Sequence, residues 1–595
     1  MKLFNWMGLH LHINDMSIKH LSFHKGKWII CVFLLVLILI TGMSIVDNYG
    51  ISWDEVYQSE YTWRNIRLIR TGEPLGTPIS NKGLLFELTN DSLWVFCNWL
   101  KGAFSIDPHK GIFESIQRFL QKGQDLPPAI SDHFPLQDKG YFFFKHKVTF
   151  IFSLIAYIGV IATAAVFTGR KWAWMGIIIL ALFPRYWGHS FFNMKDIPFA
   201  ALYSLSGFLT IFLVNKFLKD GFDTGIGRNK LSLLSFSYGV LLGLTSSIRL
   251  GGMIFLPIFI ITLLSILIFD KRRSLGKIIY VSLMHFLLIL TACSLIILLL
   301  HPSSWNDPIS WFIRSIKELS YYTDYPLGVR YFYENLSAGK LPWHYLPVWF
   351  LITTPIPTIA LAATGFIIYV FRFNQIPKRM KISFVILVLQ IVSLPIIAIM
   401  KGSIIYDGIR HFLFIVPGIV VLASIGACEM FRILKATQLK IVFSVALIVA
   451  YSNVLFDMGS LHPYEYVYFN QFVRDKDLGE KFETDYWALS FREATEWVNK
   501  NKKTNDSGKS MILVCGPDGL YYASALFAET SFVASCNNLS ESDIFYYKGI
   551  KMPFYYIGLN RFNHNQKYLN CKKVHVIERQ LSQSKLPLAV IRYCE

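Results

Sequence analysis

Long apolar runs recur from one end of this 595-residue chain to the other, and they limit what it can fold into. Each run has about twenty residues, the length that an α-helix needs to cross a hydrocarbon core of about 30 Å. The runs cover approximately residues 28–46, 148–168, 172–188, 197–215, 232–247, 251–269, 278–300, 344–371, 382–400, 411–431 and 440–457. They predict a polytopic α-helical membrane protein with about eleven transmembrane helices.

The composition supports a membrane protein and argues against a nucleic-acid partner. Hydrophobic residues make up 53% of the chain, whereas soluble domains are usually about 45–50% apolar. The formal charge of +19 comes mainly from lysine and arginine in short loops between apolar runs. Because no long basic tract or zinc-type cysteine spacing is present, we expect no nucleic-acid binding. The first apolar run is too long for a cleaved signal peptide and is interpreted as a retained anchor.

The basic loops predict the orientation of the chain in the membrane. Every second loop carries several lysines or arginines, beginning with Arg170 and Lys171 after the second predicted span. The positive-inside rule places these loops, and the N-terminal segment 1–27, in the cytoplasm. The long loop 47–147 then lies outside, where we expect short helices resting on the membrane. An odd number of spans puts the C-terminal segment 458–595 outside as well.

The segment 458–595 is long enough to form a small domain outside the transmembrane domain 28–457. Strand-like runs at 510–515 and 574–578, with a helix-like stretch at 490–500, predict a compact α/β fold. Four of the eight cysteines fall in this segment, namely Cys515, Cys536, Cys571 and Cys594. One or two disulfides are expected if the segment lies outside the cytoplasm; four unpaired buried thiols are an equal alternative. The sequence has no Cys-x-x-Cys pair, so we expect no metal or redox site.

Ionisable residues collect on the predicted outer face. Because such residues are costly at membrane depth, they usually have a function there. Candidates for catalysis are Asp54, Glu55 and Asp196, and candidates for binding a phosphate are Arg249, Arg410, His411 and, more weakly, Lys82. Plainer interpretations exist for each. Asp54 can simply terminate the first interfacial helix, and Asp196 can cap the span that it precedes. The arginines and His411 can anchor the membrane interface, and Lys82 can be a solvated loop lysine.

These residue types together permit the transfer of a sugar from a lipid phosphate. A carboxylate can act as general base on the acceptor hydroxyl as it attacks the anomeric carbon. The lipid phosphate that departs needs a cation more than an acid, and arginine grips phosphate oxygens as a fork. One base and one phosphate clamp predict a single displacement with inversion. No glycine-rich nucleotide loop is present or needed.

The chain resembles the GT-C superfamily of integral-membrane glycosyltransferases, in particular the branch of aminoarabinose:lipid A transferases and protein O-mannosyltransferases. Five features carry the resemblance, within about residues 25–460: Trp53-Asp54-Glu55, Asp196-Ile-Pro198, Arg249, the run 342–347 (PWHYLP) and the run 406–411 (YDGIRH). The resemblance implies a polyprenyl-phosphate-sugar donor and an inverting active site in the outer leaflet. It implies that Asp54 acts on the acceptor with Glu55 beside it, and that Asp196 is a second acidic position.

The resemblance also implies that Arg249, Arg410 or His411 contacts the donor phosphate. Some members of the superfamily use a divalent metal and others do not; here we see no cage of oxygen ligands and expect no required cofactor. The C-terminal segment does not match the lectin-like or repeat domains of several eukaryotic members, which argues against a protein acceptor.

The leading hypothesis is a glycosyltransferase of the bacterial inner membrane, which moves a hexose, pentose or modified sugar from a polyprenyl phosphate to a lipid or envelope glycan such as lipopolysaccharide. A transporter or flippase of lipid-linked sugars is the first alternative, although transporters usually have repeated halves and polar residues at the midplane. The second alternative is an assembly subunit that presents the C-terminal domain.

Overall fold

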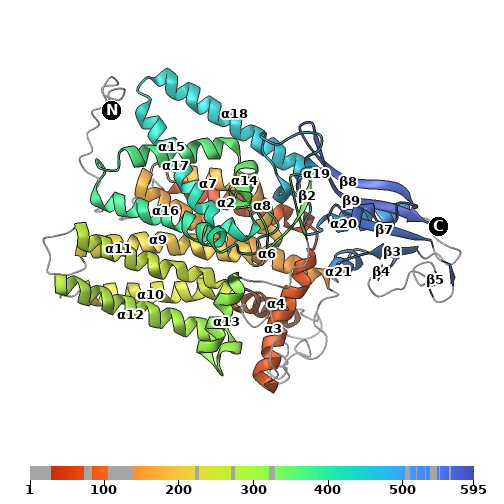
Figure 1. Ribbon diagram of the computed structural model, residues 1–595, viewed down its shortest axis with the longest axis horizontal. Helices are drawn as coiled ribbons and strands as arrows, with labels where there is room; N and C mark the ends of the chain where they lie inside the picture. Colours follow the sequence, from red (N-terminus) through yellow and green to blue (C-terminus); the bar gives the residue numbers. More distant parts are fainter. Residues whose placement is uncertain are drawn as a thin grey trace.

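The computed structural model shows a bundle of long helices with a β-sheet domain at one end (Figure 1). It describes residues 28–72, 83–104, 138–220, 227–269, 275–320, 328–502, 510–516, 519–529, 531–536, 546–547, 550–551, 553–561 and 564–595. The N-terminal segment 1–27 and Lys82 therefore lie outside the described residues. The chain is a polytopic helical membrane protein with a C-terminal mixed-sheet domain.

Within the described residues, eight helices are long and apolar enough to cross a membrane, or nine spans if one bent pair counts as a span. The eight are α2 (Ile29–Ile45), α6 (Lys139–Thr168), α9 (Asp196–Asp220), α10 (Gly227–Ile248), α12 (Leu275–Leu300), α16 (Lys378–Met400), α17 (Val416–Ile433) and α18 (Thr437–Leu461). All eight correspond to predicted apolar runs.

Three predicted spans take another form, which is why the count falls below eleven. They are α7 (Trp174–Ala181) with α8 (Pro184–Phe192), the short α11 (Phe255–Phe269) after the 3-10 turn η6 (Leu250–Ile254), and α14 (Tyr345–Thr353) with α15 (Ile356–Phe371). Helices α14 and α15 bend by 115° at Pro355, because proline has no backbone N–H to continue a helix. Pro184 begins α8, a position that proline favours.

Helices α9 and α17 form the centre of the bundle. In α9 and α17, 78% and 89% of the apolar 18-residue stretch is buried, whereas in α2 and α18 the buried share is only 22% and 11%. Glycine lets α15 and α17 approach closely: a Cβ added at Gly426 would lie 1.9 Å from the Leu361 carbonyl oxygen. Small residues at helix contacts are typical of membrane bundles, where close packing replaces the hydrophobic effect.

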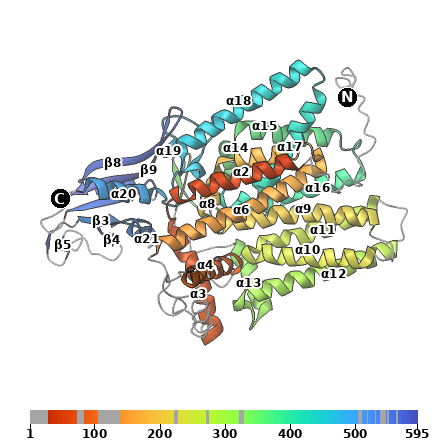
Figure 2. The ribbon, with the colours of Figure 1, turned by 180° about the vertical axis from the view of Figure 1, so that it is seen from behind.

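The helices predicted for the first long loop lie at the same end of the bundle as the sheet domain (Figures 1 and 2). They are α3 (Trp53–Thr71) and α4 (Leu85–Phe104); α13 (Pro308–Ser320) and the hairpin of β1 (Gly328–Tyr331) and β2 (Glu334–Ser337) belong to a later connection. A buried ion pair attaches α4 to α6, with Lys145 Nζ 2.5 Å from Glu87 Oε2. Burial raises the pKa of Glu87 to about 7, although Lys145 acts to lower it.

The C-terminal domain is built on a five-stranded mixed sheet in the order β4-β3-β7-β9-β8. Strand β3 is parallel to β4 and β7, while β9 is antiparallel to β7 and β8. The strands are β3 (Ser510–Val514), β4 (Ser531–Ser535), β7 (Phe554–Leu559), β8 (Lys572–Leu581) and β9 (Ser584–Cys594), with a separate pair β5 (Tyr546–Tyr547) and β6 (Ile550–Lys551). Helices α19 (Leu478–Lys481), α20 (Ser490–Asn501) and α21 (Gly519–Ala525) accompany them. The strands and the helix predicted from the sequence are all present.

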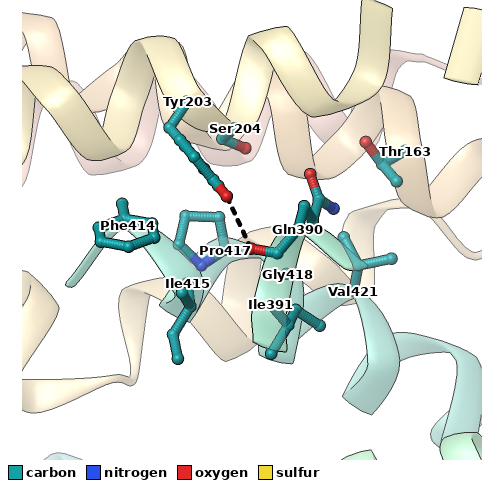
Figure 3. Close-up of a pocket in the computed structure, with 10 residues that line it drawn as sticks. All are labelled: Thr163, Tyr203, Ser204, Gln390, Ile391, Phe414, Ile415, Pro417, Gly418 and Val421. Carbon is teal, nitrogen blue, oxygen red and sulfur yellow. Dashed lines mark hydrogen bonds between the residues drawn. The ribbon is translucent and has the colours of Figure 1, made fainter. Parts of the chain in front are cut away.

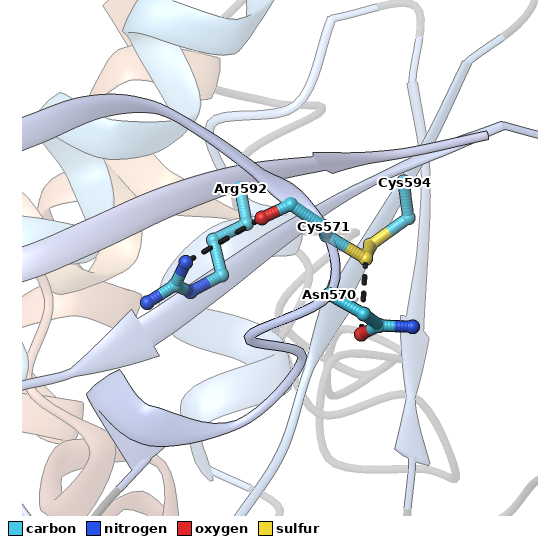
Figure 4. Close-up of a disulfide and its surroundings, with 4 residues drawn as sticks. All are labelled: Asn570, Cys571, Arg592 and Cys594. Atoms are coloured by element: carbon cyan, nitrogen blue, oxygen red, sulfur yellow. Dashed lines mark hydrogen bonds between the residues drawn. A yellow bond between two sulfur atoms is a disulfide. The ribbon is translucent and has the colours of Figure 1, made fainter.

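Two disulfides close this domain, so the expectation of bonded cysteines is confirmed. Cys515 pairs with Cys536 across β3 and β4, and Cys571 pairs with Cys594 at the end of β9. The second bond lies beside Arg592, whose Nη1 donates to the Cys571 carbonyl oxygen at 3.5 Å (Figure 4). Because disulfides persist in oxidising compartments, this pairing accords with the predicted extracytoplasmic position. The other four cysteines are free: Cys31, Cys97, Cys293 and Cys428.

We expect protein denatured without reductant to take up four alkyl groups, and eight after reduction, because two disulfides protect four of the eight thiols. Intact-mass spectrometry after alkylation measures this directly. Replacing Cys571 and Cys594 by serine should lower the stability of the C-terminal domain by about 3 kcal/mol, whereas Cys97→Ser, at a free thiol, serves as the control. Eight alkyl groups without reduction would contradict the pairing.

Candidate active site

The start of α3 fixes Asp54 against the C-terminal domain. Ser52 and Glu55 form a capping box, in which Glu55 Oε1 accepts a hydrogen bond from the Ser52 backbone N at 2.8 Å. Trp53 attaches the helix to the tail of the chain: its Nε1 donates to the Tyr486 carbonyl oxygen at 3.0 Å, and its backbone N donates to the Trp487 carbonyl oxygen at 3.3 Å. Asp54 is the next residue, so its position depends on both contacts.

The Asp54 carboxylate is half-buried and only partly bonded. Gln58 Nε2 donates to Asp54 Oδ2 at 2.8 Å, and within the described residues no hydrogen bond reaches the other oxygen. The carboxylate lies close enough to Arg410 for the two charges to attract. The Asp54 carboxylate therefore attracts the buried Arg410 guanidinium, and among the described residues one of its oxygens accepts no hydrogen bond.

Glu55 has a different environment from its neighbour. Its side chain is 1% exposed, one oxygen belongs to the capping box, and the other lies 2.9 Å from His146 Nε2 on α6. One oxygen thus caps α3, and the other holds α3 to α6. The sequence placed Glu55 beside Asp54 as a catalytic candidate, and the structure directs the two carboxylates to separate partners.

Asp196 begins α9, and Asn193 performs the capping that the sequence left open for Asp196. Asn193 Oδ1 accepts from the Asp196 backbone N at 2.9 Å, and Asn193 Nδ2 donates to Asp196 Oδ2 at 2.9 Å. The Asp196 carboxylate is buried and lies between two arginines. It pairs with Arg249, and Arg410 Nε lies 3.6 Å from Asp196 Oδ2.

From Asp196 a line of alternating charges, which we call the ion chain, runs into the C-terminal domain. Its members in order are Arg249, Asp196, Arg410, Asp407, Arg561 and Glu483. The last three distances are 2.8 Å from Arg410 Nη1 to Asp407 Oδ2, 2.5 Å from Arg561 Nη2 to Asp407 Oδ1, and 3.2 Å from Arg561 Nε to Glu483 Oε1. All but Arg249, whose side chain is 20% exposed, are almost fully buried. Formal charges cancel along the chain, and this makes its burial tolerable.

A tight turn aims Asp407 between its two arginines. Asp407 and Gly408 both have positive φ angles, 59° and 63°. Aspartate is one of the few side chains that adopt this left-handed conformation readily, and at Gly408 a Cβ would lie 2.9 Å from the Trp349 ring. At the far end of the ion chain, burial raises the pKa of Glu483 to about 7, although the charge of Arg561 acts to lower it.

Aromatic rings cover Arg410, and two guanidinium nitrogens near Asp196 remain without hydrogen bonds. The Arg410 guanidinium lies 4.8 Å from the Trp487 ring and 5.0 Å from the Tyr406 ring. Its Nη2 is 3.2 Å from His411 Nε2. Within the described residues, the buried Nε atoms of Arg249 and Arg410 have no hydrogen-bond acceptor. Buried donors of this kind are rare in folded proteins. Arg249 has the more exposed side chain of the two, whereas Arg410 Nε faces Asp196 Oδ2 at 3.6 Å.

Sequence reasoning missed Arg185, which lies in α8 inside the predicted span 172–188. The side chain is fully buried; its Nε donates to the Tyr468 carbonyl oxygen at 3.0 Å and its guanidinium lies 5.2 Å from the Trp349 ring. Neither Nη atom has an aligned acceptor among the described residues, although the Tyr486 ring is nearby. An arginine within an apolar run was the available signal, because such residues usually mark function.

The cavity in Figure 3 does not coincide with these residues. It lies among α6, α9, α16 and α17 and has mainly apolar walls, with Tyr203 donating to the Gln390 carbonyl oxygen at 2.7 Å. Tyr203 lies two helical turns beyond Asp196 on α9, about 10 Å away. Among the described residues, no group of three or more His, Cys, Asp or Glu side chains could hold a metal ion.

Solved structures of membrane glycosyltransferases match the chain over most of its length. The match to the Archaeoglobus fulgidus oligosaccharyltransferase in its apo form covers 90% of this chain and 70% of the oligosaccharyltransferase chain, at a TM-score of 0.47 and 12% identity. The match to ArnT from Cupriavidus metallidurans bound to undecaprenyl phosphate covers 95% of this chain and 97% of the ArnT chain, at a TM-score of 0.42 and 10% identity. No family model and no curated protein matches the sequence.

These matches agree with the GT-C resemblance of the sequence.

Replacing Glu55 should separate its structural contacts from any catalytic one. Glu55→Ala removes the cap and the His146 contact, and should lower the free energy of unfolding by about 1–2 kcal/mol. Glu55→Gln keeps a side chain that can complete the capping box and should keep most activity. Thermal unfolding of the purified variants measures the first effect and transfer rates measure the second. A Glu55→Gln variant that folds normally but is inactive would show that the charge itself is needed.

Proposed function

We propose that this protein transfers a sugar from a polyprenyl-phosphate donor to a lipid or envelope-glycan acceptor, with inversion at the anomeric carbon. The membrane is a bacterial inner membrane, and the site faces its outer side. One observation carries the proposal: the partly bonded carboxylate of Asp54 attracts Arg410 electrostatically, and Asp196 pairs with both Arg410 and Arg249. A base and a phosphate clamp are thus coupled through their charges.

Asp54 is the general base in this proposal. The reaction requires a group that removes the proton from the acceptor hydroxyl while the oxygen attacks the sugar. Asp54 has an unoccupied oxygen and is reachable, whereas both oxygens of Glu55 are bonded and Asp196 is buried between two arginines. Gln58 keeps the other Asp54 oxygen in place.

Arg249 and Arg410 bind the departing lipid phosphate. In the part of the chain that the structure describes, neither Nε atom has a hydrogen-bond acceptor, and Arg249 is also partly exposed, so a phosphate can reach it. Arginine is suited to this task because its planar fork matches phosphate oxygens and stays charged. His411 lies within 3.2 Å of Arg410 and can contribute a further contact. Lys82 stays a candidate from the sequence alone.

Asp54→Asn should lower the transfer rate by about 10²–10⁴-fold, because an amide cannot accept the proton. The variant should have the same membrane level and melting temperature, since the Gln58 contact can be kept by the amide oxygen. Glu60→Gln is the matched control, because Glu60 lies on the same helix and pairs only with Arg64 among the described charges. Rates are measured with a short-chain polyprenyl-phosphate sugar. Unchanged transfer by folded Asp54→Asn would refute the assignment.

Arg249→Met should raise the KM for the donor by about ten- to a hundredfold, the usual effect of losing a charged hydrogen bond. Arg249→Lys should recover only part of this, because an ammonium lacks the fork. The control is Arg372→Gln: Arg372 pairs with Glu429 near the other end of α17, at 3.1 Å, and should not affect the donor. Initial rates over a range of donor concentrations decide, and an unchanged donor KM in Arg249→Met argues against the clamp.

A further inference from the structure

We propose that Arg561 of the C-terminal domain is a positioning residue that orients Arg410 through Asp407. The inference rests on the proposed function and adds to it, because it makes the phosphate clamp incomplete without the C-terminal domain. Arg561 lies just beyond β7, about 150 residues along the chain from Asp407. It touches no group that we assign to the donor or the acceptor.

Two segments fix the Arg561 side chain, which is 2% exposed: the turn at Asp407 and the stretch 483–486. Its Nη2 lies 2.5 Å from Asp407 Oδ1, its Nη1 donates to the Tyr486 carbonyl oxygen at 2.8 Å, and its Nε lies 3.2 Å from Glu483 Oε1. Contacts at both Nη atoms, with the Glu483 carboxylate beside Nε, hold the planar guanidinium in one orientation.

Asp407 passes this orientation to Arg410. One of its carboxylate oxygens pairs with Arg561 and the other with Arg410, at 2.5 and 2.8 Å. The left-handed backbone at Asp407, with φ of 59°, limits how the side chain can leave the turn. If Arg561 is lost, the carboxylate is free to rotate toward Arg410, and the guanidinium of Arg410 is no longer held in one plane.

The same part of the tail also holds the helix that carries the base. The carbonyl oxygens of Tyr486 and Trp487 accept both hydrogen bonds from Trp53, the residue before Asp54. The Trp487 ring lies 4.8 Å from the Arg410 guanidinium, and the Tyr486 carbonyl is shared with Arg561. The tail therefore sets the spacing between Asp54 and Arg410.

A buried ion chain is a poor means of attaching one domain to another. Replacing buried ion pairs by apolar side chains is often neutral or stabilising, while removing one partner is costly. What such contacts do supply is one defined geometry. We therefore assign Arg561 and Asp407 the role of orienting Arg410, and not that of holding the bundle and the sheet domain together.

The test compares Arg561→Lys with the double variant Arg561→Met/Glu483→Gln in the full-length protein. The glutamine removes the acid that would otherwise be buried without its partner, so the double variant stays folded if Asp407 keeps Arg410. Arg579→Met is the matched control, because Arg579 belongs to the same domain but pairs with Glu493. The donor KM, the acceptor KM and the melting temperature are measured for each.

We expect the donor KM of the double variant to rise about tenfold or more, since small misplacements of a binding group have effects of this size. Arg561→Lys should recover part of the loss, and the acceptor KM and the control should be unchanged. An unchanged donor KM overturns the inference. So does a loss of active protein with both KM values unchanged, because a purely structural role gives that result.

Failure of the proposed function is recognised separately. If the wild type makes no glycolipid from any polyprenyl-phosphate sugar, the function is wrong, and the inference is judged by a cryo-EM structure of the double variant. Displacement of the Arg410 guanidinium from the Trp487 ring then supports positioning by Arg561. Arg410 in its original place overturns it.

Discussion

The arrangement of the candidate site depends on one line of buried charges that crosses from the helix bundle into the C-terminal domain. Arg410 is at its centre, between Asp196 at the start of α9 and Asp407 in the turn before α17. None of these groups could be buried alone, because an unpaired charge in the interior costs several kcal/mol. Pairing makes each position depend on the next. The bundle, the turn and the sheet domain therefore have to fold together for any of them to take its place.

Most charged groups of the site are fully paired, and the few that are only partly bonded, Asp54 and Arg249, give the site its chemistry. Glu55 is fully bonded and secures α3, whereas Asp54, one residue earlier, keeps an oxygen available. Arg249 is the most exposed member of the ion chain, and its Nε has no hydrogen-bond acceptor among the described residues. A carboxylate and a guanidinium in this state match the two needs of transfer from a lipid phosphate: to take up a proton and to stabilise a departing phosphate.

Much of this arrangement is predictable from the sequence, because the positive-inside rule sorts residues by the side of the membrane on which they lie. The alternation of basic loops puts Asp54, Asp196 and Arg410 on one face, and the structure brings their charges together. The partners from the tail are not predictable, since nothing local in the sequence of Arg561 indicates a contact about 150 residues away. Hydropathy also treats 172–188 as one span, although Pro184 begins a second helix there and Arg185 is buried against the Tyr468 carbonyl and the Trp349 ring.

The most direct test is to incubate the purified protein with a short-chain polyprenyl-phosphate sugar of known anomeric configuration and an extract of envelope lipids. The glycolipid product is then examined by NMR. The account predicts a new glycosidic bond with inverted configuration and an equal amount of free polyprenyl phosphate, because one base and one phosphate clamp give a single displacement. Retention of configuration would contradict that mechanism. Movement of the lipid-linked sugar between leaflets without a new bond would contradict the account as a whole and favour a transporter.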